Sequence, residues 1–142
     1  MDAFDADVLI YAAVPGHELG RRVRHLFPSG AVEAKGVVAG IGSLLLLPEL
    51  MAKPLRDGAS DELAALGALL SRLELRPLDD ATADLATALG AVYGLRAADA
   101  VHLATAVGAG ADRFLTNNTK DLPKSITEID ITYPTDLPIP KR

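Results

Sequence analysis

The sequence opens with MDAFDADVLIYAA, residues 1–13, in which Asp5 and Asp7 precede the apolar run Val8 to Tyr11. We interpret the start of this stretch as a first strand that ends at an acidic turn, followed by a helix from Val8. Carboxylates at the C-terminal end of a strand lie where open α/β sheets bind their ligands. Alternatively, Asp5 and Asp7 cap the helix, because Asp accepts hydrogen bonds from N–H groups of a first helical turn. The stretch alone leaves both interpretations open.

The composition is that of an ordinary globular protein. The 142 residues, 49% hydrophobic and 23% charged, fit one domain over residues 1–142 with a core of Leu, Val, Ile and Ala. Cysteine is absent, which excludes disulfides, thiolate metal sites and a cysteine nucleophile, and suits a reducing compartment. The apolar runs are too short to span a bilayer and no charged-then-apolar leader opens the chain. We therefore expect a cytoplasmic protein that does not enter a membrane.

The charge balance is acidic. Fourteen Lys and Arg against nineteen Asp and Glu give a formal net charge of -5. This argues against a passive nucleic-acid-binding module, because such modules neutralise phosphates with a basic face. It leaves room for an enzyme that contacts nucleic acid through bound cations.

Hydrophobic spacing and capping residues predict helices that alternate with strands, an order typical of an α/β protein with a mostly parallel sheet. Ser43 is expected to cap a helix that contains Glu49, and residues 53–58 are expected to form a link. The arginines at positions 21, 22 and 24 form either a solvated helix face or a patch that steers phosphates. Further helices are predicted at 17–27, from 60, at 79–94 and at 95–110, and strands near 37–38, at 73–78, 114–116 and 129–133.

Acidic residues far apart in the sequence are predicted to share one edge of this sheet. Asp5 and the turn from Thr116 to Asp121 each follow a predicted strand, and Glu49 and Asp99 lie on helices that could line the same edge. Two carboxylates about 4 Å apart repel by roughly 4 kcal/mol at an effective dielectric near 20. Such a cluster needs cations or protons. Hard oxygen ligands without cysteine indicate Mg²⁺ or Mn²⁺, with a phosphodiester as the natural substrate.

Other chemistries have less support. His17, His25 and His102 lack the spacing of metal-binding histidines, and no nucleophile elbow or phosphate-binding glycine loop is present. His102 follows Asp99 by three residues, so it either touches the acidic site or is a packed histidine.

These residues carry a resemblance to a known family. The segments FDADVLIY (residues 4–11), LPEL (47–50), ADAVHLA (98–104) and FLTNNTKDL (114–122) resemble, in this order, the motifs of PIN-domain ribonucleases, specifically the toxins of VapC-type toxin-antitoxin pairs. Two positions depart from the family pattern. Asn118 stands where many members have a fourth acid, and Asp7 replaces the commoner Asn. Asp121 is the alternative candidate for the fourth acid.

The resemblance implies a three-layer α/β/α fold and a Mg²⁺- or Mn²⁺-dependent endoribonuclease. Asp5, Glu49 and Asp99 would hold the metal ions, with Asp121 or Asn118 completing the shell through water. One metal ion would activate a water molecule as the nucleophile and a second could stabilise the leaving oxygen. Thr116 either orients a ligand or a scissile phosphate, or is a buried strand residue. The family also implies an inhibiting cognate antitoxin, with a segment in the groove, and a homodimer.

Two other functions fit part of the pattern. A phosphoacceptor receiver domain would use Asp5 and Asp7 with Thr116 and Lys120, although no acceptor Asp follows a central strand. The other is a PIN fold that has lost catalysis and serves as a binding module. Retention of Asp5, Glu49 and Asp99 argues against it.

Overall fold

The computed structural model describes residues 1–27 and 38–141, and it has a five-stranded, fully parallel sheet at its centre. The strand order is β3-β2-β1-β4-β5, so the first strand of the chain lies in the middle of the sheet. The register pairs Ala3 with Ile41 on one side and with Phe114 on the other. The strands are β1 (Asp2–Phe4), β2 (Gly40–Ser43), β3 (Leu73–Arg76), β4 (Arg113–Leu115) and β5 (Asp130–Thr132).

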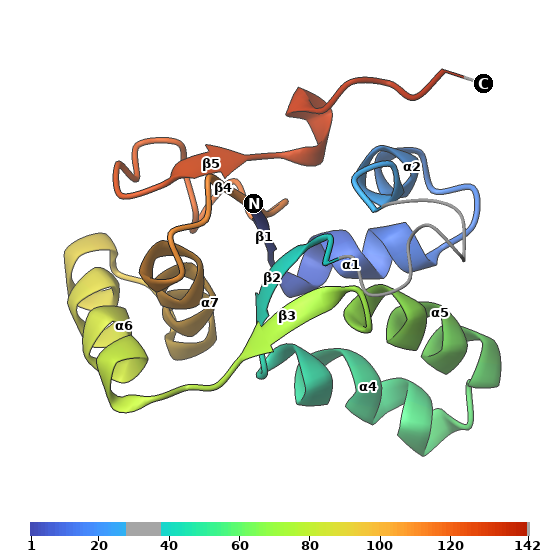
Figure 1. Ribbon diagram of the computed structural model, residues 1–142, viewed down its shortest axis with the longest axis horizontal. Helices are drawn as coiled ribbons and strands as arrows, with labels where there is room; N and C mark the ends of the chain where they lie inside the picture. The colour runs from blue at the N-terminus through green and yellow to red at the C-terminus, as the bar shows by residue number, and fades with distance from the viewer. Residues whose placement is uncertain (28–37, 142) are drawn as a thin grey trace.

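Helices cover both faces of the sheet, which gives the three layers expected for the α/β/α class (Figure 1). Neighbouring residues of each strand point to opposite faces. Ala3 and Phe114 therefore pack toward α6 (Asp80–Tyr93) and α7 (Ala97–Gly108). Phe4 and Leu115 pack toward the other helices. That second layer contains α1 (Ala6–Ala13), α2 (Glu18–Arg24), α4 (Leu46–Asp57) and α5 (Ser60–Leu70).

Several predicted helix ends are confirmed. The Asp79 carboxylate accepts a hydrogen bond of 2.8 Å from the Thr82 N–H and caps α6. Gly94 ends this helix in the left-handed conformation, with φ of 65°, which a glycine adopts without steric cost. Ser60 begins α5, as the acidic first turn indicates.

Other local predictions were wrong. Residues 53–57 belong to α4, which continues through Pro54 and ends at Gly58, so they are not a link. The Ser43 hydroxyl accepts from the Leu45 N–H at 3.1 Å but does not cap α4, because that helix begins only at Leu46. Of the strand predicted near positions 37–38, Val38 lies before β2, and position 37 lies outside the described residues.

Two of the three arginines near α2 bind the protein's own backbone. Arg24 donates to the carbonyls of Ala12 and Val14 at 2.9 and 3.1 Å. Arg22 donates to the carbonyls of Thr135 and Leu137 at 3.3 and 3.4 Å. These contacts tie α2 to α1 and to the C-terminal segment, so these two side chains are neither a free solvated face nor a free phosphate patch.

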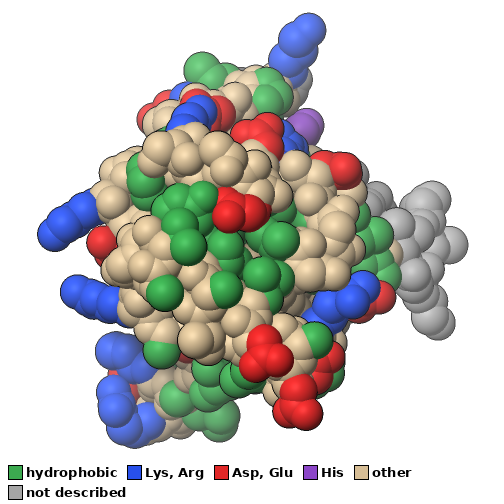
Figure 2. All heavy atoms as spheres, turned by 90° about the vertical axis from the view of Figure 1, so that its left-hand side faces the viewer, with side chains coloured by type: hydrophobic (Ala, Val, Ile, Leu, Met, Phe, Trp, Pro, Cys, Tyr) green, Lys and Arg blue, Asp and Glu red, His purple; other side chains and the backbone are tan. Residues whose placement is uncertain are grey.

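The outer face of α6 and α7 carries apolar side chains. Figure 2 shows hydrophobic groups gathered near the middle of this face, with acidic groups among them. Leu78 and Val92 are 55% and 69% exposed.

Within residues 1–27 and 38–141, no helix combines the length and apolar character needed to cross a bilayer.

The close contact of α2 with α1 gives a stability prediction. A Cβ atom at Gly20 would lie 2.0 Å from the Tyr11 carbonyl oxygen, which belongs to the backbone of α1 and cannot turn aside. Overpacking of this kind costs about 1–3 kcal/mol, so we expect Gly20→Ala to lower the free energy of unfolding by about 2 kcal/mol. Urea denaturation monitored by circular dichroism measures this.

The matched control for this substitution is Gly67→Ala in α5. A Cβ atom there meets nothing closer than the Met51 methyl carbon at 3.9 Å. Because Ala is the better helix former, Gly67→Ala should raise the free energy of unfolding by roughly 0.5–1 kcal/mol. Equal stability of the two variants would contradict the close packing of α1 against α2.

Candidate active site

Asp5 lies at the carboxyl end of the central strand, directly after β1. One of its carboxylate oxygens, Oδ1, accepts from the Ala6 N–H at 2.8 Å and caps α1. The other, Oδ2, accepts from the Thr116 hydroxyl at 2.8 Å. Asp5 is buried, 6% exposed. Both interpretations of the opening stretch therefore hold for Asp5, which caps a helix and also faces the sheet edge where ligands bind in α/β folds.

Thr116 links Asp5 to the turn after β4. Phe4 pairs with Leu115 in the sheet, so the residues that follow them meet at the same edge, as predicted. Thr116 is fully buried, and its hydroxyl oxygen also accepts from the Asn118 N–H at 3.1 Å. The side chain therefore holds Asp5 and the turn in one arrangement.

Asn118 and Asp121 bind each other within this turn. The Asn118 amide donates to Asp121 Oδ2 at 3.3 Å, and its oxygen accepts from the Asp121 N–H at 3.1 Å. Both side chains are half-buried. The turn therefore presents the two candidates for the fourth acid position as a hydrogen-bonded pair.

Asp7 also reaches the turn after β4. Its Oδ2 accepts from the Asn117 N–H at 3.0 Å, whereas its Oδ1 is buried and has no hydrogen-bond partner in the described part of the chain. Burial, followed by repulsion from Asp5, raises the pKa of Asp7 to about 7. Asp99 adds to this repulsion.

Asp99 lies in the first turn of α7, as predicted. Its pKa is raised, first by burial and then by the negative charges of Asp5 and Asp121, while His102 and Arg96 lower it. Asp99 is therefore near enough to the acids of the two strand ends to feel their charges.

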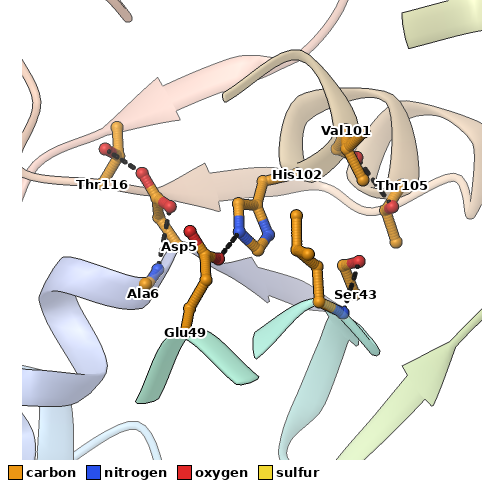
Figure 3. Close-up of polar contacts among 9 residues, drawn as sticks. Asp5, Ala6, Ser43, Glu49, Val101, His102, Thr105 and Thr116 are labelled. Carbon is orange, nitrogen blue, oxygen red and sulfur yellow. Dashed lines mark hydrogen bonds and ion pairs between the residues drawn. The ribbon is translucent and has the colours of Figure 1, made fainter. Parts of the chain in front are cut away.

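Glu49 approaches the same group from α4. Its carboxylate contacts Nε2 of His102, which α7 presents toward it (Figure 3). Glu49 also raises the pKa of Asp5, whose main cause of elevation is burial. His102 is buried, and its ring also contacts Glu49. The histidine is therefore both a packed residue and a neighbour of the acidic side chains.

Four distant parts of the chain thus bring acidic side chains into electrostatic contact at one sheet edge. We call Asp5, Asp7, Glu49, Asp99 and Asp121 the acidic cluster. In the described residues, no three Asp, Glu or His side chains are grouped tightly enough to form a ready metal site. The carboxylates of Asp5, Asp7, Asp121 and Glu49 are instead held by Thr116, Asn117, Asn118 and His102, respectively.

The donor set nevertheless fits a hard divalent cation. All five members of the acidic cluster are carboxylates, the type of oxygen ligand that Mg²⁺ and Mn²⁺ bind. The pKa values of Asp5, Asp7 and Asp99 are raised first by burial, and repulsion from neighbouring carboxylates raises them further. The unpartnered Oδ1 of Asp7 is a further buried acceptor. Positive charge placed here would be stabilised.

The chain belongs to the PIN domain family, whose model matches residues 3–124. This assignment confirms the family resemblance and contradicts the receiver-domain alternative. No curated protein matches the chain in sequence.

Two solved structures share the fold. One, a toxin-antitoxin complex from Klebsiella pneumoniae, contains a chain that is 24% identical, with a TM-score of 0.70, covering 94% of this chain and 98% of that chain. The other is VapBC2 from Rickettsia felis bound to a DNA fragment from the promoter, where the match is 19% identical with a TM-score of 0.69. It covers 93% of this chain and 97% of that chain.

Two contacts of the site were not predicted. One joins Glu49 to His102, and the other joins Asp7 to the Asn117 N–H. The spacing of Asp99 and His102 on one helix was a signal for the first, because residues three apart share a helix face. Nothing in the sequence indicated the second, since it depends on a backbone group of a turn.

Proposed function

We propose that this PIN-domain protein is a Mg²⁺- or Mn²⁺-dependent endoribonuclease and the toxin of a toxin-antitoxin pair. The observation that carries the proposal is the convergence of the acidic cluster at the carboxyl edge of a parallel sheet. Burial and mutual repulsion of these acids favour bound protons or cations, and a divalent cation is what a metal-dependent nuclease uses on a phosphodiester.

In this proposal Asp5, Glu49 and Asp99 hold the cation, and Asp121 or Asn118 completes its shell through water. When bound, such a cation lowers the pKa of a water molecule and offsets charge on the phosphate. Thr116 keeps Asp5 in place through the 2.8 Å hydrogen bond from its hydroxyl. Asp99 and Asp121 are half-buried, so both side chains are partly accessible to a substrate.

The acidic character of the protein is consistent with this substrate. With a net charge of -5, the chain has to approach a polyanion through bound cations rather than through a basic face. The resemblance to PIN-domain ribonucleases makes RNA the proposed polymer.

Partners are proposed by similarity. The structure from Klebsiella pneumoniae is a toxin-antitoxin complex, and that from Rickettsia felis is a complex of the VapBC2 pair with promoter DNA. We propose that this chain also binds a cognate antitoxin, forms a homodimer and acts in the cytoplasm. A PIN fold that has lost catalysis and serves as a binding module is the second candidate. The carboxylates of the acidic cluster, which suit a divalent cation, argue against it.

The test of the proposed function begins with brief expression in cells and sequencing of the new RNA 5′ ends, which identifies the cleaved sequence. An oligonucleotide of that sequence is then incubated with the purified chain. Cleavage should stop in EDTA and return with Mn²⁺ or Mg²⁺. Because the proposed nucleophile is water, the products should lack a 2′,3′-cyclic phosphate, and a 2′-O-methyl group beside the scissile bond should not abolish the chemistry.

Two results of this experiment would contradict the proposed function. Cleavage that persists in EDTA would show that no divalent cation is needed, and products that end in a cyclic phosphate would show that the ribose hydroxyl is the nucleophile. The proposal of metal-dependent hydrolysis would then be wrong.

A further inference from the structure

His102 stands out among the described residues because its ring is buried beside the acidic cluster. Its side chain is 2% exposed, and Nε2 contacts the carboxylate of Glu49 (Figure 3). An ionised carboxylate only accepts hydrogen bonds, so the ring is the donor in this pair. The contact joins α7, which carries Asp99, to α4, which carries Glu49.

Glu49 needs such a partner more than the other acids do. Asp5 and Asp7 are short side chains held by backbone N–H groups at 2.8 and 3.0 Å. Glu49 is longer, its side chain is 33% exposed, and in the described part of the chain its carboxylate makes no hydrogen bond except that with His102. Without this contact the side chain would be free to sample several rotamers.

The ring itself has no other polar role in the described structure. Its second nitrogen, Nδ1, is buried and lacks a hydrogen-bond partner there. Buried polar atoms of a purely structural side chain are normally satisfied. In the described residues, the Glu49 carboxylate is therefore the hydrogen-bond partner of this ring.

We propose that His102 is a positioning residue that holds the Glu49 carboxylate beside Asp5, with one oxygen bound to the ring and the other left for the divalent cation. The inference rests on the proposed function, since it assigns His102 a part in building that cation site. Partners that orient metal-binding groups in this way commonly contribute 10- to 100-fold to metal affinity.

The test measures Mn²⁺ affinity of the full chain by calorimetry and by electron paramagnetic resonance of free Mn²⁺. We expect His102→Leu to weaken binding about 10- to 100-fold. His102→Gln, whose amide can donate from a similar position, should keep most of the affinity. The matched control is Thr105→Val on the same helix. It removes a buried hydroxyl whose partner among the described residues is the Val101 carbonyl, and this variant should bind Mn²⁺ as wild type does.

A double-mutant cycle separates positioning from general damage. If His102 acts through Glu49, His102→Leu should cause no further loss of Mn²⁺ affinity in a Glu49→Gln background. Fully additive losses would overturn the inference, as would unchanged affinity in His102→Leu. Thermal unfolding in EDTA shows which variants are folded, and the cycle can be run with His102→Asn if the Leu variant is not.

Nuclear magnetic resonance of the histidine rings gives a readout that needs no variant. Addition of Mg²⁺ should shift the ring nitrogen signals of His102 and leave those of His17 and His25 in place. Mg²⁺ binding without a shift at His102 would refute the positioning role while the nuclease proposal stands. A wild-type chain that binds neither cation would contradict both.

Discussion

Replacement of Asp99 by Asn is expected to lower RNA cleavage by about 10²- to 10³-fold while the protein stays folded. A cation site contributes several kcal/mol to the stabilisation of charge in the reaction, and loss of one carboxylate ligand removes much of it. The fold should tolerate the change, because Asn has the same size and Asp99 lies half-buried in a first helical turn. Loss of repulsion with Asp5 and Asp121 offsets the loss of the helix-dipole interaction.

The measurement is initial cleavage rate of the identified oligonucleotide at saturating Mn²⁺. Asp61→Asn is the matched control, since Asp61 is also an acid in a first helical turn, at the start of α5, and lies outside the acidic cluster. It should cleave at the wild-type rate. If Asp99→Asn is as active as Asp61→Asn, Asp99 has no part in the reaction.

Replacement of Asp7 by Asn is expected to stabilise the protein at neutral pH when divalent cations are removed. The pKa of Asp7 is raised from 3.8 to about 7, chiefly by burial. Ionisation of this group therefore opposes folding, by up to about 4 kcal/mol for a shift of this size. The Asn oxygen can still accept from the Asn117 N–H, which Asp7 binds at 3.0 Å.

The sign of the effect sets its pH range. Below pH 3.8 Asp7 is protonated in both the folded and the unfolded chain, so Asn brings no advantage. Between 3.8 and about 7 the unfolded chain loses the proton first, so the stability of the wild type falls as pH rises. Above about pH 7, Asp7 is ionised in both states, and the full cost of its ionisation in the folded protein remains.

Urea denaturation in EDTA at several pH values checks this expectation. The difference in unfolding free energy between Asp7→Asn and wild type should grow from pH 4 to pH 8, and Asp61→Asn should show no such growth. A constant difference across this range would mean that the Asp7 carboxylate is not perturbed in the folded state.

The overall fold could be predicted from the sequence because its signals are local. Apolar runs marked the strands, and capping residues such as Asp79 and Gly94 marked helix ends. Once the strands were taken as parallel, Asp5 and the turn after β4 were expected at the same edge of the sheet, and the structure makes β1 and β4 neighbours. The order of the motifs then led to the PIN family.

Predictions of local structure were wrong where tertiary contacts override local sequence signals. Residues 53–58 were expected to form a link, yet α4 continues through Pro54 to Asp57, and the apolar face of the helix, including Leu50 and Pro54 itself, is buried. A proline costs one backbone hydrogen bond, and packing of such a face compensates for it. Similarly, Arg22 and Arg24 bind carbonyls of segments that are remote in sequence or beyond a turn, which no helical pattern reveals.

The sequence indicated candidate acids but not their contacts, and their role in binding a cation stays a prediction. The residue types and their order identified Asp5, Glu49 and Asp99. The contact between Glu49 and His102 depends on how α4 and α7 pack on either side of β2, so it required the structure.

The central claim is that the acidic cluster binds a divalent cation. A crystal grown with Mn²⁺ and examined by anomalous scattering tests it most directly. The account predicts an anomalous peak in contact with the carboxylates of Asp5 and Asp99, which is absent from crystals of Asp99→Asn. A wild-type crystal with no peak at this edge of the sheet, at Mn²⁺ concentrations that support RNA cleavage, would contradict it.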